Sequence, residues 1–369
     1  MTTQLASDAT AASPDRPGHY EPGHYPPTLP ASWYTSDDVF ALERDRIFHR
    51  NWFLFARSDQ FAATGDYVVA DVWGLSVLVL RNNDGGLTGL LNVCRHRAGR
   101  LLTDGTGTCK PATALRCRYH GWKYNLDGTL QLAPGFSAGG EFDPAAHSLF
   151  PVRVETWNGL VFVTLSPETE TLVDWLGDIV DIARDYPSTD TLDYAKTVEI
   201  EGNANWKLYG ENGVEGYHLA FVHTWLLQAV GPNAYDVNIH ENGKFVGFPV
   251  EYQAWDLERK FKGYWILKFP GLLVHFSELE FNCEQVIPAG VRQTRLRHMF
   301  WTPKNDPQLA EKIARDWKIT MQEDIGICEE VQRNLDGGVY RNGRLSPARE
   351  RGAIYFQSLV RNAIGNAAP

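Results

Sequence analysis

The chain has 369 residues, 43% of them hydrophobic and 22% charged, which is typical of an ordinary globular protein and long enough for two domains. Its 35 Lys and Arg residues stand against 45 Asp and Glu residues, and the net charge of -10 argues against partners such as nucleic acid or an anionic membrane surface. No apolar run approaches the roughly 18 residues of a membrane span, and residues 1–35 hold no apolar signal-peptide core. The five unevenly spaced cysteines do not match a secreted disulfide framework. We therefore expect a cytoplasmic protein.

Residues 1–35 are rich in Pro, Ala, Thr and Ser and lack aliphatic periodicity. They are predicted to be a mobile tail whose aromatic side chains can lie on the surface. A short amphipathic helix is predicted over residues 36–50, with Ser36 as the N-cap that accepts hydrogen bonds from the first free amides. We expect this helix to pack on the second domain.

Alternating apolar and polar residues from Tyr67 onward predict short strands separated by turn residues. The predicted strands cover residues 67–72, 75–80, 87–93, 122–124 and 159–165. Together they indicate a small all-β domain over residues 51–165.

The pattern becomes mixed over residues 166–369, where helices and strands occupy separate stretches. Predicted helices cover residues 172–186, 206–223 and 307–335, and predicted strands cover residues 194–201, 272–276 and 294–300. The helix over 307–335, closed by two glycines, is expected to be the last strong element. Segregated helices and strands predict an α+β domain in which helices flank an antiparallel sheet.

Two Cys-His pairs stand in Gly-rich loops of the first domain, Cys94 with His96 and Cys117 with His120. Two sulfurs and two imidazoles in separate short pairs are typical of a metal site. Zinc fingers pair cysteine with cysteine and histidine with histidine, whereas here each loop supplies one of each. This arrangement favours a [2Fe–2S] cluster in which two thiolates hold one iron and two imidazoles hold the other. We expect Cys109, which lies between the pairs, to be a loop thiol and not a ligand.

A second group of metal-ligand residue types is formed by Glu215, His218 and His223. In a regular helix Glu215 and His218 would share a face, but five residues rotate the helix by about 500°. His218 and His223 could therefore bind one metal only if the helix is distorted or ends between them.

The helix over 307–335 supplies a carboxylate that completes this group. Its predicted apolar stripe comprises Ile313, Trp317, Met321, Asp324, Cys328, Val331 and Leu335. Asp324 on that stripe is costly unless a cation compensates it, and two His with one carboxylate match the facial triad of non-haem Fe(II) sites. The alternatives are an ion pair with an arginine such as Arg333, or a helix orientation that differs by one step. Glu323 and Glu329 are predicted to be solvated.

The motif C-R-H-R followed by C-R-Y-H-G-W resembles the Rieske centre of the Rieske non-haem iron oxygenases, the family of aromatic ring-hydroxylating oxygenase alpha subunits. The segments E211NGVEGYHLAFVH and Q322EDIGICEEVQRNL resemble the family's mononuclear iron motif and the segment that supplies its third ligand. The resemblance spans residues 36–360. It implies a Rieske domain over 51–165 and a catalytic domain over 166–369.

Carried over residue by residue, the resemblance implies that Cys94, His96, Cys117 and His120 hold the cluster and that His218, His223 and Asp324 bind iron. It also implies that Glu215 bridges the Rieske histidines to the iron histidines, and Asn212 is a further predicted catalytic residue. The chain departs from the family in two ways. The spacer that holds Cys109 and Pro111 is longer, and the bridging position more often holds Asp than Glu.

The activity that the resemblance implies is oxygenation of an organic substrate. Electrons would pass from a ferredoxin or a flavin-containing reductase through the cluster to the mononuclear Fe(II), where O2 is the co-substrate. In the family, the cluster of one subunit faces the iron of the next, which implies a homotrimer. No G-x-G-x-x-G motif follows a predicted strand, so NAD(P)H is expected to bind only to the partner reductase.

The substrate is the least determined feature. Similarity of residues 205–218 to oxygenases of aromatic carboxylates favours an aromatic substrate; the alternative is monooxygenation or N-demethylation of a quaternary ammonium or another small non-aromatic compound. An aromatic carboxylate requires a buried Arg or Lys, whereas a cation requires clustered Trp and Tyr. Candidate pocket residues are Tyr209, Asn212, Phe221, Leu226, Leu227, Trp265, Phe269, Leu273, His275 and Phe281.

Two rival hypotheses remain open at this point. A pure Rieske electron carrier would leave the second group of ligands unexplained. A zinc-stabilised binding module would contain zinc without acid-labile sulfide.

Overall fold

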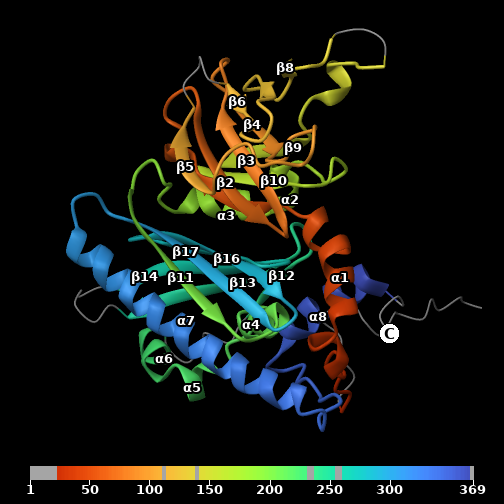
Figure 1. Cartoon of the computed structure of the whole chain (residues 1–369). Coiled ribbons are helices and arrows are strands. Elements are labelled where there is room, and N and C mark those ends of the chain that lie inside the picture. Colours follow the sequence, from red (N-terminus) through yellow and green to blue (C-terminus); the bar gives the residue numbers. More distant parts are fainter. Residues whose placement is uncertain (1–22, 110–113, 138–140, 231–236, 254–259, 366–369) are drawn as a thin grey trace, which may run out of the picture.

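The computed structural model describes residues 23–109, 114–137, 141–230, 237–253 and 260–365 (Figure 1). Its strands form two seven-stranded sheets and one three-stranded sheet, and the paired neighbours run antiparallel. An all-β first domain is followed by an antiparallel sheet with helices, which confirms the predicted α+β fold. Within these ranges, no helix combines the length and apolar character needed to cross a bilayer.

The first seven-stranded sheet has the order β1-β10-β9-β4-β3-β2-β5. Its strands are β1 Phe53–Arg57, β2 Asp66–Val72, β3 Leu75–Arg81, β4 Leu87–Leu91, β5 Gly105–Thr108, β9 Pro151–Trp157 and β10 Leu160–Thr164, and the small sheet comprises β6 Leu115–Arg116, β7 Lys123–Tyr124 and β8 Leu130–Leu132. Buried leucines between these two sheets, including Leu78 and Leu90, form one apolar cluster with Cys94 and Cys117. The core of the first domain therefore extends directly to the predicted cluster ligands.

The second sheet has the order β11-β17-β16-β15-β14-β13-β12. Its strands are β11 Asp193–Gly202, β12 Asn238–His240, β13 Phe245–Gln253, β14 Lys260–Lys268, β15 Leu272–Ser277, β16 Phe281–Gly290 and β17 Gln293–Thr302. The helices are α1 Asp37–Arg46, α2 Leu172–Leu176, α3 Ile179–Ile182, α4 Trp206–Asn212, α5 Leu219–Val222, α6 Thr224–Val230, α7 Pro307–Asp336 and α8 Arg351–Ile364. Figure 1 shows α7 lying along this sheet, and α7 contacts both β11 and α4.

Two of the three predicted helices of the second domain are interrupted. Gly177, with a positive φ of 58°, separates α2 from α3 within the predicted helix over 172–186. The predicted helix over 206–223 divides into α4 and α5. The last strong element is α8 and not α7, so that prediction is wrong. α8 lacks a side-chain N-cap bond, and its start therefore has no capping signal in the sequence.

The long helix α7 matches the predicted bounds closely and buries Asp324 as expected. Its buried face differs by one position at the C-terminal end, where Val331 is exposed and Gln332 is buried. Gln332 can be buried because its amide is satisfied: its oxygen accepts from the Asn205 amide at 3.0 Å, and its nitrogen donates to the Tyr34 carbonyl at 3.4 Å. Arg333 is exposed, which removes it as a buried partner of Asp324.

The N-terminal segment is docked where the structure describes it. Leu29 is fully buried and its amide donates to Gln357 at 2.9 Å, while Pro27 forms a bridge with Arg344. The prediction of a mobile tail is therefore wrong for residues 23–35, because this segment fills an apolar site on α8. Residues 1–22 lie outside the described part of the chain.

Helix α1 connects the N-terminal segment to the second domain. Ser36 is its N-cap and accepts from the Val39 amide, as predicted. The buried carboxylate of Glu43 accepts from the Trp206 indole at 2.8 Å and pairs with Lys207, both on α4. Because α4 also leads into the predicted iron motif, this contact holds the motif against the N-terminal helix.

Candidate functional site

Two loops of the first domain bring the Cys-His pairs together. Cys94 and His96 follow β4, and Cys117 and His120 lie between β6 and β7. Both sulfurs are 2% exposed, and the His96 and His120 ring centroids are 4.7 Å apart. The structure thus brings the four residues, the first and last of which are 26 positions apart in the sequence, into one site, as the paired spacing predicts.

Glycines shape both loops. Gly121 has a positive φ of 76°, which a residue with a side chain would adopt only with strain. A Cβ atom on Gly99 would come within 3.1 Å of the Cys117 sulfur, and the Gly99 carbonyl accepts from the Cys94 amide at 2.9 Å. The glycines therefore let the two loops approach each other around the sulfurs.

The donor set fits a [2Fe–2S] cluster. The buried Nδ1 atom of His96 has no hydrogen-bond partner among the described residues, and this ring stacks on Trp122 at 5.1 Å. The Cys94 sulfur lies 3.2 Å from the Tyr124 hydroxyl. Burial raises the pKa of the Cys94 thiol, so the thiolate form needs a compensating cation at this place. Two buried thiols and two imidazoles, one with an unused nitrogen, provide the ligands such a cluster takes.

Cys109 is a third sulfur near this site. It is buried in the same apolar cluster as Cys94 and Cys117, and its amide donates to Gly65 at 2.7 Å. Burial raises the pKa of the Cys109 thiol. Its exclusion from the ligand set remains a prediction.

His218 and His223 lie at opposite ends of the short helix α5, and Asp324 faces them from α7. The preceding helix α4 ends at Asn212, and the chain turns before His218. This turn precedes both histidines. The interruption that the five-residue spacing requires is the end of α5, where His223 leaves the helical conformation with φ -116° and ψ 65°.

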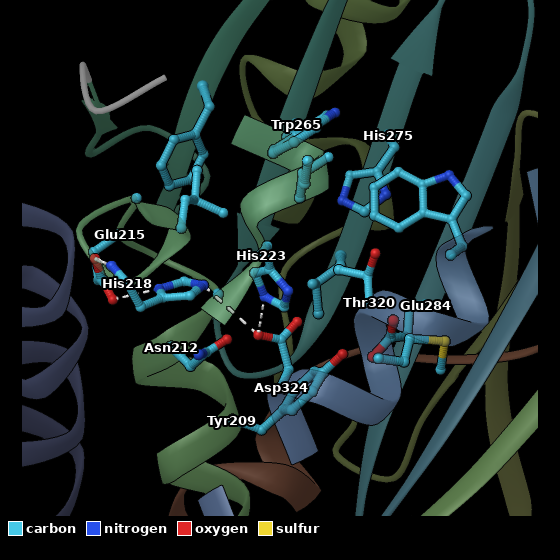
Figure 2. Close-up of a pocket in the computed structure, with 18 of the residues that line it drawn as sticks. Tyr209, Asn212, Glu215, His218, His223, Trp265, His275, Glu284, Thr320 and Asp324 are labelled. Atoms are coloured by element: carbon cyan, nitrogen blue, oxygen red, sulfur yellow. Dashed lines mark hydrogen bonds and ion pairs between the residues drawn. The ribbon is translucent and has the colours of Figure 1, made fainter. Parts of the chain in front are cut away.

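The three predicted iron ligands converge on one point (Figure 2). His223 Nε2 is 2.7 Å from Asp324 Oδ1, and His218 Nε2 is 3.6 Å from the same oxygen. One ligand atom from each of the three residues lies within 4.8 Å of the others. Two imidazole nitrogens and one carboxylate oxygen at such separations fit a facial triad around a single metal ion.

Each histidine of the triad has a second carboxylate behind it. Glu215 Oε1 is 2.6 Å from His218 Nδ1, and Glu323 Oε2 is 2.6 Å from His223 Nδ1. A carboxylate at Nδ1 keeps the proton there and directs the Nε2 lone pair to the metal. Glu323 was predicted to be solvated, and its side chain is 34% exposed, but its contact with His223 was not predicted. Glu323 is next to Asp324 in the sequence and therefore lies on another face of α7, but the His223 ring extends far enough to contact it.

Glu215 is positioned by a turn and not by a helical face. Its second oxygen accepts from the backbone amides of Tyr217 and His218, the latter at 3.2 Å. These contacts fix the carboxylate next to His218.

The charge state of His223 reflects its surroundings. Burial lowers the pKa of His223, but hydrogen bonds to Asp324 and Glu323 outweigh burial and raise it. Two carboxylates against one imidazole give the site a net affinity for positive charge.

A cavity of about 640 Å³, counting the open space at its mouth, adjoins the triad. Six of the ten predicted pocket residues line it, namely Tyr209, Asn212, Leu226, Trp265, Leu273 and His275. The other four do not. Phe221 is 78% exposed, Leu227 belongs to a small apolar cluster beside α6, and Phe269 and Phe281 are in the core. Lining residues that were not predicted include Phe248, Glu284, Trp317, Thr320 and Met321.

The cavity contains an aromatic corner formed by Trp265, His275 and Trp317. The His275 and Trp317 rings stack with centroids 4.3 Å apart, and the Trp265 and Trp317 centroids are 5.9 Å apart at an angle of 67°. Burial, followed by the neighbouring His298, lowers the pKa of His275 to about 3. The corner is therefore electrically neutral and presents aromatic surface.

A buried polar chain backs this corner. His275 Nδ1 and His298 Nε2 are each 2.7 Å from the Asn282 side-chain oxygen, and His298 Nδ1 is 3.0 Å from Glu284 Oε2. Burial lowers the pKa of His298 to about 3 and raises the pKa of Glu284 to about 8. Figure 2 places Asp324 between His218 and Glu284.

Comparisons with known proteins match both halves of the chain. Residues 51–154 match the model of the Rieske [2Fe-2S] domain, and residues 189–366 match that of the ring hydroxylating alpha subunit catalytic domain. The chloroplastic choline monooxygenase of Spinacia oleracea is 26% identical over 348 residues, covering 91% of this chain and 78% of that protein.

Two further proteins are similar over nearly their whole length. The carnitine monooxygenase oxygenase subunit of Acinetobacter pittii is 27% identical over 352 residues, which cover 90% of this chain and 94% of that protein. A solved quaternary ammonium Rieske monooxygenase, described for carnitine oxidation by gut microbiota and inter-subunit electron transfer, superposes with a TM-score of 0.81. It is 25% identical, over 92% of this chain and 96% of that one.

Proposed function

Because this chain belongs to the Rieske non-haem iron oxygenases, we propose that it hydroxylates a quaternary ammonium compound at an iron held by His218, His223 and Asp324. The observation that carries the choice of substrate class is the composition of the cavity. Trp265, Trp317 and Tyr209 line it, and its described lining residues include no Arg or Lys. A cation requires the aromatic rings that this cavity has, whereas an aromatic carboxylate requires a buried Arg or Lys, which the described lining lacks.

The named relatives support the same substrate class. Two of them are monooxygenases of choline and carnitine, which are both quaternary ammonium compounds. The aromatic substrate favoured by the sequence has less support than this alternative, and monooxygenation is the corresponding proposal for the reaction.

The reaction class is that of the family: an oxidoreductase that incorporates oxygen from O2, using electrons from a separate NAD(P)H-dependent reductase or ferredoxin. The [2Fe–2S] cluster supplies electrons, and the mononuclear iron supplies the O2-activating chemistry. In monooxygenation, one oxygen atom enters a substrate C–H bond as a hydroxyl group. The other leaves as water, with two electrons and two protons consumed.

The residues of this chain have distinct parts in that reaction. Cys94, His96, Cys117 and His120 would hold the cluster. Glu215 and Glu323 keep a proton at the Nδ1 atoms of His218 and His223, so both Nε2 atoms remain available to the metal. The aromatic corner orients the substrate and excludes water from the same side.

The positions of the two sites support the proposal of a homotrimer. In Figure 1 the small sheet that carries Cys117 and His120 is at one end of the chain, α5 is at the other, and the second sheet lies between them. Electrons would therefore pass more directly from the cluster of one subunit to the iron of the next. A head-to-tail contact of this kind closes into a ring, and the inter-subunit electron transfer described for the similar structure supports it.

The substrate class can be tested by single turnover. Protein loaded with Fe(II) is reduced by dithionite, freed of excess reductant, and exposed to O2 with choline, carnitine or benzoate. We expect oxygenated product from a quaternary ammonium compound and none from benzoate, as measured by mass spectrometry. Product from benzoate alone would contradict the proposal and restore the aromatic substrate.

Replacing Glu323 with glutamine is expected to weaken Fe(II) binding by about 10-fold, the lower end of what losing a carboxylate behind a metal-binding histidine costs. The effect is at the lower end because the Glu323 side chain is 34% exposed. Affinity is measured by competition with a chelator. Glu329→Gln is the matched control, since Glu329 lies on the same helix and accepts from Asn203 instead. Equal affinities in the two variants would contradict the role of Glu323.

A further inference from the structure

The cavity wall carries acidic side chains at three places. Glu215 and Asp324 are engaged with the histidines of the triad, and Glu284 is the third. No Arg or Lys is present among the described residues that line the cavity. Because Glu215 and Asp324 are already paired with the triad histidines, Glu284 is the acidic group of the wall that remains for a ligand.

Glu284 is buried on β16 with only part of its hydrogen-bonding capacity used. Its side chain is 2% exposed, it shares a hydrogen bond with the Tyr209 hydroxyl, and its Oε1 atom has no partner in the described structure. His298 lies beside Oε2, but burial lowers the pKa of His298 to about 3, so this imidazole is neutral and does not balance a charge. An unpartnered buried carboxylate oxygen is costly, and a ligand cation would remove that cost.

The aromatic corner stands in the same cavity as this carboxylate. Trp265 and Trp317 offer π faces, which attract a methylated ammonium group that cannot donate a hydrogen bond. Tyr209 adds a third ring and touches Glu284 directly. Aromatic faces and a carboxylate are the two kinds of group that stabilise a quaternary nitrogen in a pocket with little water.

We propose that Glu284 is the counter-ion of the substrate and that the substrate is a quaternary ammonium cation without a carboxylate of its own. The inference rests on the proposed function and restricts its substrates to cations without a carboxylate. A zwitterion such as carnitine would bring its anionic end into a cavity whose described wall offers no Arg or Lys to bind it. A cation that carries a hydroxyl group, as choline does, avoids this cost.

Ligand binding tests the role of charge directly. The iron-loaded enzyme is titrated under nitrogen by calorimetry with choline, with 3,3-dimethyl-1-butanol, which replaces the charged nitrogen with carbon, and with carnitine. We expect choline to bind at least about 10-fold more tightly than either of the others, since it alone combines a cation with no anion. Tighter binding of carnitine than of choline would overturn the inference.

The variant Glu284→Gln assigns the effect to this residue. It should lose most of the preference for choline over 3,3-dimethyl-1-butanol, because only the attraction of the aromatic rings for the cation remains. Unchanged binding of the neutral alcohol shows that the cavity is intact. Glu211→Gln is the matched control: Glu211 is a partly buried carboxylate that also has a raised pKa, about 7, but it faces Tyr34 outside the cavity. A preference for choline that is as large in Glu284→Gln as in the unaltered protein would overturn the assignment.

Failure of the inference and failure of the proposed function give different results. If carnitine binds better and is oxygenated in the single-turnover assay, the proposed function stands and the role of Glu284 is wrong. If no quaternary ammonium compound yields product, the proposed function falls and the inference falls with it.

Discussion

Replacing Asp324 with alanine is expected to abolish substrate oxygenation while the visible spectrum of the cluster stays the same. Asp324 is the carboxylate on which both triad imidazoles converge, at 2.7 and 3.6 Å. Its loss leaves two histidines, which are too few to hold iron firmly. We expect product formation to fall by at least about 100-fold, the upper end of what losing even an outer partner of a metal ligand costs.

The cluster should not respond, because its ligands come from a separate sheet. Iron and acid-labile sulfide are measured together with single-turnover product. The expected result is two irons and two sulfides per chain without the third iron. Glu330→Ala is the control, since Glu330 is exposed on the same helix. Full activity in Asp324→Ala would place the chemistry elsewhere, and zinc without sulfide in the unaltered protein would indicate a zinc-stabilised module.

The ligand pairs and the fold class could be predicted because their signals are local. Cys94 with His96 and Cys117 with His120 are short motifs, and the apolar period of α7 puts Asp324 on its buried face. The same apolar period wrongly predicted that Val331 lies on the buried face. A periodic pattern assigns burial by apolar character, and it cannot foresee that Gln332 is buried because Asn205 and Tyr34 satisfy its amide.

The cavity wall was harder to predict, for a different reason. Eight consecutive residues of β16, from Phe281 to Pro288, are buried, so the strand lacks the alternation that separates a cavity face from a core face. The sequence around Glu284 therefore gave no indication that this side chain lines the cavity. Glu323 was missed because its partner is 100 positions away, a contact that only the tertiary structure creates.

Helix interruption was the one long-range feature that the residues did indicate. His218 and His223 cannot share a helical face, so a common metal site implied a break. The structure has that break at His223, where α5 ends, and a second break between α4 and α5 leaves Glu215 outside a helix. The carboxylate reaches His218 through a turn held by backbone amides, which sequence spacing alone does not specify.

Replacing Glu215 with glutamine is expected to slow electron transfer from the cluster to the iron by about 100-fold. Glu215 binds His218 Nδ1 at 2.6 Å, and its side chain is 12% exposed, so one edge of the carboxylate can still accept a hydrogen bond. Nearby Tyr217 and Phe221 are 45% and 78% exposed, and exposed aromatic side chains at this place support the proposed subunit contact. The partner subunit's His120 is the donor we propose for the free edge.

The measurement is the rate at which the reduced cluster is oxidised after O2 and substrate are added, normalised to the iron content of the catalytic site. An amide cannot accept from two imidazoles as a carboxylate does, because its nitrogen only donates. Glu215→Asp keeps the charge and should recover part of the rate. Glu350→Gln is the control: this carboxylate lies close enough to Glu215 to influence it electrostatically, but it accepts from the Ser346 amide. If Glu215→Gln oxidises its cluster as fast as Glu350→Gln at equal iron content, electrons reach the iron without this residue, and the link between subunits must lie elsewhere.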